Sequence, residues 1–247
     1  RHSMSWKYLV PNAFTALSMI LGMAAVALAA SGDADLAAWL ILWGVLLDKL
    51  DGGAARMLGA SSEFGAEMDS FADFATFGVA PAALVFFSLT GGVIDQPGEG
   101  TIAGACAVYT LAVAIRLARF NVREPEGSKL LFFGVPTTLC GGLLGSGWLT
   151  MGVFGVNGAV EPILPFVLLV LGALMVSNVR MPKFSMRWSK PVNLFQVVNM
   201  AIAYVFVPLQ IFPEYLFALC ASYLVIGMVW GVLYGSRLIE QESTHQS

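Results

Sequence analysis

The chain has 247 residues, of which 57% are hydrophobic and only 12% are charged, and its formal net charge is −3. Soluble domains usually carry about 25% charged residues, so this composition excludes an ordinary water-soluble domain. No nucleic-acid partner is expected. The three cysteines lie in separate apolar runs without a CxxC pair, which argues against a disulfide framework or a zinc site.

Apolar runs long enough to cross a bilayer, about 20 residues each, recur along the whole chain. We therefore expect one all-α, polytopic membrane domain over 1–247, with eight transmembrane helices and no separate soluble module. The predicted helices run approximately over 9–30, 35–58, 64–89, 101–122, 133–154, 161–180, 191–212 and 214–236.

Aromatic and basic residues precede the first predicted helix. Trp6, Lys7 and Tyr8 suit an N-terminal interfacial segment, although an aromatic anchor explains them equally well. The apolar run over 9–30 is longer than the roughly 7–15 residues of a signal-peptide core. We therefore expect a retained transmembrane helix there rather than a cleaved leader.

The positive charges fit the eight-helix arrangement. All 13 lysines and arginines fall on one side of it, and the opposite loops carry acidic residues without a lysine or arginine. The positive-inside rule then places both termini in the cytoplasm. We expect a multi-pass protein of the cell (inner or cytoplasmic) membrane whose active site opens to the cytoplasmic face.

Four aspartates interrupt the apolar pattern of the second and third predicted helices. Asp48 and Asp51 are three positions apart, so they share one helix face; Asp69 and Asp73 are four apart and do the same. If the two helices are antiparallel neighbours, the pairs meet at the cytoplasmic end, where four carboxylates repel one another unless cations intervene. Oxygen ligands without histidine or cysteine suit Mg²⁺, Mn²⁺ or Ca²⁺, and four carboxylates can hold two such ions.

Small residues follow the first acidic pair. Positions 52–55 are glycine or alanine and leave one helix flank almost bare, and Arg56 beyond them can pair with a phosphate. Together with metal ions, this predicts a pyrophosphate or nucleotide site. The alternative is that the small residues allow close helix packing and that the acids pair with Lys49 and Arg56, but two bases cannot neutralise four carboxylates.

At these positions the sequence resembles a known family. The pattern is similar to the complete motif of the CDP-alcohol phosphotransferases and reads Asp48-x2-Asp51-Gly52-x2-Ala55-Arg56-x8-Gly65-x3-Asp69-x3-Asp73. The resemblance implies that the four aspartates bind two divalent cations, Mg²⁺ or Mn²⁺, with Ca²⁺ as a non-productive occupant. It also implies that Asp73 is the base that takes the proton of the acceptor hydroxyl. The residues implied to line the CDP site are Gly52, Ala55, Arg56 and Gly65.

The same resemblance implies the reaction and the assembly. A phosphatidyl group passes from CDP-diacylglycerol to an alcohol and CMP leaves, with catalysis mainly by positioning and electrostatics. Similar enzymes are homodimers, so a homodimer surrounded by membrane lipid is expected.

Flanking segments resemble those of the family members that use L-serine as acceptor, and they occur in the same order. They are Pro11-Asn12-x2-Thr15, Phe77–Pro81, Arg116–Asn121, Phe133–Pro136 and Val176–Arg180. One departure is that Thr137-Thr138 follows this fourth segment where that subfamily usually has a further proline.

Serine carries a carboxylate and an ammonium group beside its hydroxyl, and the sequence offers candidates that could bind both. A guanidinium can bind a carboxylate through two parallel hydrogen bonds. Asn12 and Thr15 could donate to the nucleotide or phosphate, with helix capping as the competing interpretation of Asn12. Each arginine could instead fix topology or bind anionic lipid headgroups. The candidate acceptor-binding residues are Arg116, Arg119, Asn121, Glu67 and Arg180.

Two other acceptors and two other protein classes remain open. Glycerol 3-phosphate and inositol phosphate would use the same donor chemistry, but their dianionic phosphates should prefer a denser arginine pocket. An ion-coupled transporter tends to place its ion site near the bilayer midplane, often in repeated halves, whereas these acids lie at a helix end without a second copy. A non-catalytic scaffold would not need four convergent carboxylates.

Overall fold

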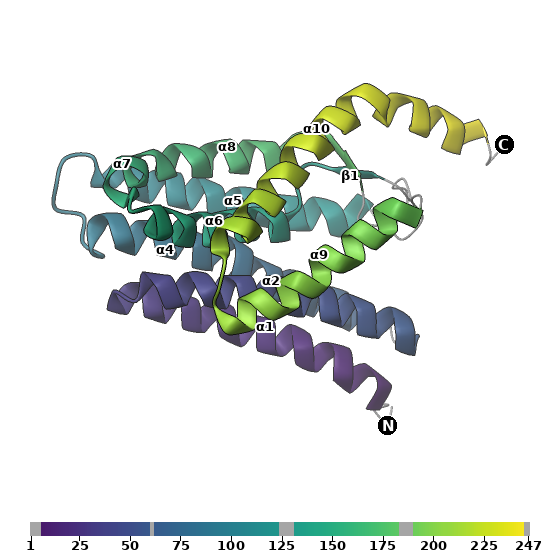
Figure 1. Cartoon of the computed structure of the whole chain (residues 1–247), viewed down its shortest axis with the longest axis horizontal. Coiled ribbons are helices and arrows are strands. Elements are labelled where there is room, and N and C mark those ends of the chain that lie inside the picture. Colours follow the sequence, from purple (N-terminus) through teal and green to yellow (C-terminus); the bar gives the residue numbers. More distant parts are fainter. Residues whose placement is uncertain (1–5, 60–61, 124–130, 183–189, 245–247) are drawn as a thin grey trace.

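The computed structural model describes residues 6–59, 62–123, 131–182 and 190–244, and the chain is mostly helical (Figure 1). Side chains are described for these residues except 6–9, 54–58, 123, 131–132, 182 and 234–244. The elements are α1 (Trp6–Ser31), α2 (Ala34–Leu58), α3 (Glu63–Asp73), η1 (Phe74–Val79), α4 (Ala80–Thr90), α5 (Glu99–Arg123), β1 (Leu131–Phe133), α6 (Thr137–Phe154), α7 (Asn157–Val160), η3 (Glu161–Ile163), α8 (Leu164–Val176), β2 (Arg180–Pro182), α9 (Lys190–Leu209) and α10 (Pro213–Thr244).

Six segments of the described chain are helical, long and apolar enough to cross a membrane. They are Val10–Ser31, Glu63–Thr90, Glu99–Val122, Asn157–Val176, Lys190–Leu209 and Pro213–Leu233. By length and composition, these helices confirm the prediction of a helical multi-pass protein.

The count of eight spans stays a prediction. The two remaining predicted spans are helices in the structure, namely α2 and α6. Charged residues at Asp48, Lys49 and Asp51 interrupt the apolar run of α2, and α6 has only 18 residues and is rich in glycine. Of the basic residues on the predicted cytoplasmic side, four lie outside the described residues: Arg1, Lys129, Lys183 and Arg187.

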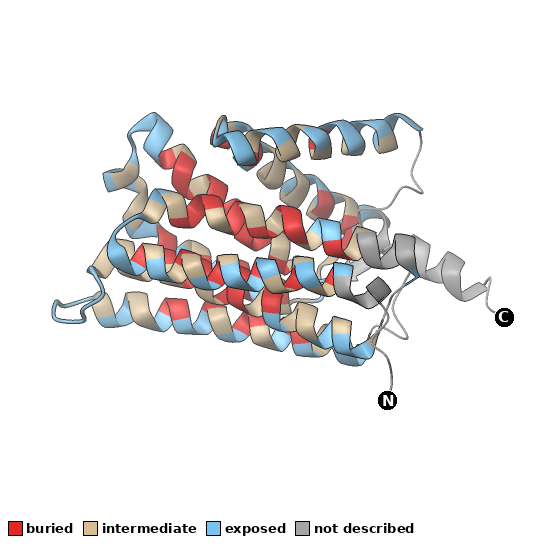
Figure 2. Cartoon of the chain, turned by 90° about the horizontal axis from the view of Figure 1, so that it is seen from below, coloured by how far each residue is buried: buried red, intermediate tan, exposed pale blue. Residues whose placement is uncertain are grey.

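Both ends of the described chain lie at the same end of the helix bundle. α1 begins and α10 ends on the right-hand side of Figures 1 and 2. An even number of crossings produces such an arrangement, as the predicted eight-helix topology requires. The residues expected to form an interfacial segment continue directly into α1, whose helix starts at Trp6.

The third predicted helix is continuous but irregular. It consists of α3, a π-helical turn (η1) and α4, and Pro81 lies in the first turn of α4. Proline has no N–H and its ring clashes with the carbonyl four residues earlier, which here belongs to Phe77. The Tyr109 hydroxyl of α5 donates to that carbonyl at 2.8 Å, which replaces the missing donor. The sequence thus places a π turn directly after Asp73.

Small residues let α1, α2 and η1 approach closely. A Cβ atom on Gly22 of α1 would lie 2.6 Å from Oγ1 and 2.8 Å from Cα of Thr76, and one on Gly44 of α2 would also collide with Thr76. Thr76 is buried and donates to the main-chain oxygen of Ser18 at 3.0 Å. These contacts hold the helix that carries the second acidic pair against α1 and α2. Figure 2 shows the buried residues along the inward sides of the helices.

Two short strands correct the predicted boundaries of the fifth and sixth helices. β1 pairs antiparallel with β2, and Phe133 lies opposite Arg180. The fifth predicted helix therefore begins at Thr137 rather than at 133, and the sixth ends at Val176 rather than at 180. Pro136 explains the first correction, because a proline disfavours helical backbone at the residue before it.

Candidate active site

Three aspartate carboxylates from two helices converge in the structure. Asp48 and Asp51 lie one turn apart on α2, Asp69 lies on α3, and one oxygen from each lies within 4.8 Å of the others. The structure therefore brings together three of the four predicted metal ligands. An oxygen-only donor set of this kind is what hard divalent cations prefer, so the residues fit Mg²⁺ or Mn²⁺.

Hydrogen bonds hold the Asp51 carboxylate in place. Asp51 is only 6% exposed, its Oδ2 accepts from Thr15 Oγ1 at 3.0 Å, and its Oδ1 accepts from the Gly52 N–H at 2.5 Å. Thr15 could instead donate to the Pro11 carbonyl at 3.1 Å, but its hydroxyl has one proton and the charged acceptor forms the stronger bond. Thr15, predicted as a nucleotide contact, thus supports a carboxylate of the acidic group.

One lysine pairs with the acidic group. Lys49 Nζ lies 3.0 Å from Asp48 Oδ2. A single lysine neutralises one carboxylate, and the side chain of Arg56, the second base of the pairing alternative, lies outside the described residues. Carboxylates this close repel one another unless positive charge lies among them, so the group is suited to a bound cation.

Asp73 lies outside this close group of three carboxylates. It is the last residue of α3, and its Oδ2 accepts a hydrogen bond of 3.0 Å from Thr137 Oγ1, at the start of α6. Among the residues that the structure describes, no hydrogen bond is formed by Asp73 Oδ1. One oxygen of this carboxylate is thus held by the protein, and the other is available to a substrate.

The predicted nucleotide contacts lie around the ends of α2 and α3. Ser62 caps α3 by accepting a 3.0 Å hydrogen bond from the Gly65 N–H, and a Cβ atom on Gly65 would lie 3.3 Å from Asn12 Oδ1. Asn12 of α1 therefore faces the first turn of α3. A Cβ atom on Gly53 would meet no heavy atom within 4 Å, so this flank of α2 is open. Two further predicted contacts are Ala55 and Arg56, whose side chains the structure does not describe.

Arg116 of α5 is a buried cation beside the acids. The residue is 8% exposed, and its Nε has no hydrogen-bond partner in the described part of the chain. The guanidinium carbon lies 6.0 Å from the centre of the Phe120 ring, and the group is within electrostatic reach of Asp73 and Asp48. Because a buried polar group without a partner is costly, this guanidinium is suited to an anion that enters the site.

Two other predicted acceptor residues are engaged in holding the fold. Arg119 donates from Nη1 to the Val176 carbonyl at 2.7 Å and from Nη2 to Asn178 Oδ1 at 2.6 Å, which satisfies a carbonyl at the end of α8. Asn121 donates from Nδ2 to Ser70 Oγ at 3.0 Å and so joins the end of α5 to α3. Arg116 is therefore the better placed of the two neighbouring arginines to bind a ligand.

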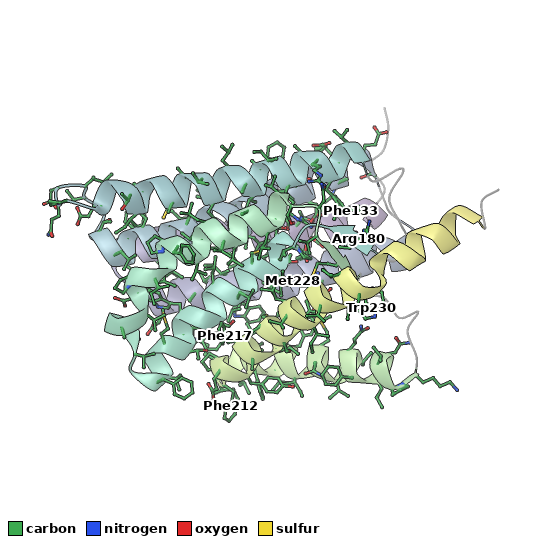
Figure 3. The ribbon with its side chains drawn as sticks, turned by 90° about the horizontal axis from the view of Figure 1, so that it is seen from above. Phe133, Arg180, Phe212, Phe217, Met228 and Trp230 are labelled. Atoms are coloured by element: carbon green, nitrogen blue, oxygen red, sulfur yellow. The ribbon has the colours of Figure 1, made fainter. Side chains whose placement is uncertain are left out.

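The last two predicted acceptor residues lie on α3 and β2. Glu67 is exposed on α3. Arg180 lies opposite Phe133 in the β1–β2 pair, and Figure 3 shows the two residues beside the part of α10 that carries Trp230. A Cβ atom on Gly231 would collide with the Arg180 carbonyl, so α10 packs directly on β2.

Sequence reasoning did not assign a role to Thr137. Helix periodicity relates residues within one element, whereas Thr137 and Asp73 are 64 positions apart. The only available signal was a threonine immediately after a proline at the start of a helix.

The fold and the acidic group define a class of protein. Residues 8–174 match the CDP-alcohol phosphatidyltransferase family, and the chain belongs to this family of transferases.

Particular relatives are similar over most of their length. The chain is 35% identical over 235 residues to a Helicobacter pylori (strain J99) protein named CDP-diacylglycerol–serine O-phosphatidyltransferase, covering 94% of each chain. A protein of the same name from Methanocaldococcus jannaschii is 30% identical over 216 residues, which is 87% of this chain and 90% of the relative. One from Bacillus subtilis is 34% identical over 182 residues, which is 71% of this chain and 90% of the relative.

Proposed function

We propose that this protein transfers the phosphatidyl group of CDP-diacylglycerol to the hydroxyl of L-serine, giving phosphatidylserine and CMP. The observation that carries the donor half is the convergence of Asp48, Asp51 and Asp69 in a chain of this family. The acceptor half is supported by the names of the relatives and by the buried guanidinium of Arg116, whose Nε lacks a partner among the described residues.

The donor half of the site is suited to a pyrophosphate. Asp48, Asp51, Asp69 and Asp73 would hold two divalent cations. Bound Mg²⁺ or Mn²⁺ would neutralise the pyrophosphate oxygens and stabilise the leaving phosphate, whereas Ca²⁺ would be a non-productive occupant. The open flank at Gly53 would form the CDP side of the site. The other residues of that side would be Gly52, Ala55, Arg56, Gly65, Asn12 and Thr15.

The reaction is a balanced displacement at phosphorus. Asp73 Oδ1 accepts the proton of the serine hydroxyl, and the serine oxygen forms a bond to the phosphorus that carries diacylglycerol. The bond from that phosphorus to the bridging oxygen breaks, and its electron pair leaves with CMP. Arg116 binds the serine carboxylate, which orients the hydroxyl toward Asp73.

The predicted topology supports a cytoplasmic reaction. All 13 basic residues fall on one side of the eight-helix arrangement, which favours a site at the cytoplasmic face of the cell (inner) membrane. CDP headgroups and serine would reach the acids from that side, and the product would stay in the membrane. This proposal also includes that residues 1–247 form one membrane domain and that two copies of the chain form a homodimer.

An acceptor panel tests the proposal. The purified full-length chain, in detergent with Mn²⁺ and CDP-diacylglycerol, should release CMP when serine is added and much less with glycerol 3-phosphate or inositol phosphate. The amount of phosphatidylserine formed should equal the amount of CMP released. CMP release that depends on one of the phosphorylated alcohols, and not on serine, would replace the proposed acceptor with that alcohol.

Arg116 and Arg119 provide a matched pair for the acceptor site. Arg116→Lys should raise the KM for serine by about tenfold or more, because a charge-assisted hydrogen bond of roughly 1.5–3 kcal/mol is lost. The KM for CDP-diacylglycerol should stay near that of the wild type. Arg119→Lys should change the serine KM much less, since that guanidinium already bonds to Val176 and Asn178. If Arg119→Lys raised the KM for serine more than Arg116→Lys does, Arg119 would be the residue that binds the serine carboxylate.

A further inference from the structure

The start of α6 contacts the catalytic helix at two matched positions. Thr137 Oγ1 donates to Asp73 Oδ2 at 3.0 Å. One turn further along both helices, a Cβ atom on Gly141 would lie 2.5 Å from the Phe77 ring, so the two backbones are close there. Thr137 is 2% exposed, and Phe77 is fully buried. The Thr137 hydroxyl is therefore held on a rigid frame against Asp73.

The position of Thr137 in α6 leaves its hydroxyl proton available to Asp73. Several threonines inside the helices donate to the carbonyl four residues earlier, namely Thr90, Thr110 and Thr150. Thr137 is the first residue of α6 and follows Pro136 in extended backbone, so it has no such helical carbonyl. The positive end of the α6 dipole also faces the Asp73 carboxylate and favours its charged form.

We propose that Thr137 is a positioning residue for Asp73. Its hydroxyl holds Oδ2, and this directs Oδ1 toward the hydroxyl of the acceptor alcohol. Thr137 keeps its own proton throughout, and the acceptor proton passes to Oδ1. This inference rests on the proposed role of Asp73 as the base, and it does not depend on which alcohol is the acceptor.

Three substitutions separate positioning from packing. Thr137→Val keeps the shape but removes the hydroxyl, Thr137→Ser keeps the hydroxyl, and Thr138→Val makes the same change at the next residue, which forms no hydrogen bond among the described side chains. CMP release should be measured with full-length protein, Mn²⁺ and the alcohol that the wild type uses fastest. CDP affinity and melting temperature should be measured for each variant to establish that the donor site is intact.

Thr137→Val should lower kcat by about 10- to 100-fold, since small errors in the placement of a reacting group carry losses of this size. Its KM for CDP-diacylglycerol and its CDP affinity should stay within about twofold of the wild type. Thr137→Ser should recover most of the kcat, and Thr138→Val should behave as the wild type. A purely structural hydrogen bond would instead lower the melting temperature of Thr137→Val without this selective loss of kcat.

Several outcomes would overturn the proposal. Wild-type kcat in Thr137→Val would do so, as would a Thr137→Ser enzyme as slow as Thr137→Val. If Thr137→Val does not fold, the kcat of Thr137→Ser tests the proposal. This variant keeps the hydroxyl, so its kcat should stay near that of the wild type if the hydroxyl positions Asp73. A wild-type kcat in Asp73→Asn would show that Asp73 is not the base, and this inference would then fail as well. Activity with an alcohol other than serine would change only the proposed acceptor.

Discussion

The Tyr109 hydroxyl donates a hydrogen bond of 2.8 Å to the main-chain oxygen of Phe77, inside the π-helical turn that follows Asp73. Both side chains are fully buried. Pro81 removes the N–H that a regular helix would offer to this oxygen, so Tyr109 supplies the replacement from a neighbouring helix. The geometry of the turn beside the proposed base therefore depends on α5.

Tyr109→Phe should destabilise the protein without altering the chemistry directly. It leaves a buried carbonyl without its donor, which costs about 1–3 kcal/mol. The expected result is a lower melting temperature in detergent and a parallel loss of activity on heating. Thr110→Val is the control, because the Thr110 hydroxyl donates to the Cys106 carbonyl within its own helix α5. An unchanged melting temperature in Tyr109→Phe would show that the Phe77 carbonyl finds another donor.

Gly22→Ala should be strongly destabilising. The new methyl group would lie 2.6 Å from Thr76 Oγ1 and 2.8 Å from Thr76 Cα, and the second of these is backbone that cannot rotate away. Overpacking of this kind costs about 1–3 kcal/mol, and it should also displace the helix that carries Asp69. Thermal unfolding and CMP release would both be measured.

Gly104→Ala is the matched control for this substitution. Gly104 is exposed in α5, and a Cβ atom there meets nothing within 4 Å. Alanine should raise helix stability there by up to about 1 kcal/mol. Equal melting temperatures for Gly22→Ala and Gly104→Ala would contradict the close packing of α1 on η1.

Metal removal should stop turnover reversibly. EDTA should abolish CMP release, and added Mn²⁺ or Mg²⁺ should restore it, because the pyrophosphate charge is otherwise unopposed. Asp69→Asn should weaken Mn²⁺ binding, measured by electron paramagnetic resonance, by about tenfold or more, since a charged ligand is lost. Glu63→Gln removes an exposed carboxylate from the same helix and should bind Mn²⁺ as the wild type does. Equal Mn²⁺ affinity in Asp69→Asn and Glu63→Gln would falsify the assignment of Asp69 as a ligand.

Arg119 and Asn178 should act as a stabilising pair. Arg119→Ala should lower the melting temperature by several degrees, because two hydrogen bonds to the end of α8 are lost. Asn178→Ala removes one of those bonds and should have a smaller effect. The double variant should be less destabilised than the sum of the two single variants. Strict additivity would show that the contact contributes nothing to stability.

The local part of the site could be predicted from the sequence. Helix geometry alone places Asp48 and Asp51 on one face, and an antiparallel neighbour brings Asp69 to them. The same reasoning put Asp73 with the other three as a metal ligand, and this stays a prediction. In the structure its carboxylate is within electrostatic reach of Asp48 and Asp69, and one of its oxygens accepts from Thr137. The Thr137 contact could not be predicted, because it comes from a helix far along the chain.

Long-range contacts could not be predicted in this way. The sequence presents Arg116 and Arg119 as equivalent neighbours, one turn apart. The structure distinguishes them, because only Arg119 reaches the end of α8. The π turn was in principle visible in Pro81, whose effect on the preceding turn is a property of proline itself. The strands that shorten the fifth and sixth predicted helices depend on pairing between distant segments, which periodicity does not reveal.

The π turn has a consequence for changes in chain length. A π turn holds one residue more than the α-helical turn it replaces, so deleting one residue between Phe74 and Val79 would regularise the helix. The two halves would keep nearly the same rotation relative to each other, because the deletion removes only the extra residue that the wider turn holds. Inserting one residue into the regular part of α3 or α4 would instead rotate the two halves by about 100°. A one-residue deletion within the π turn should therefore be tolerated better than a one-residue insertion in the helices beside it.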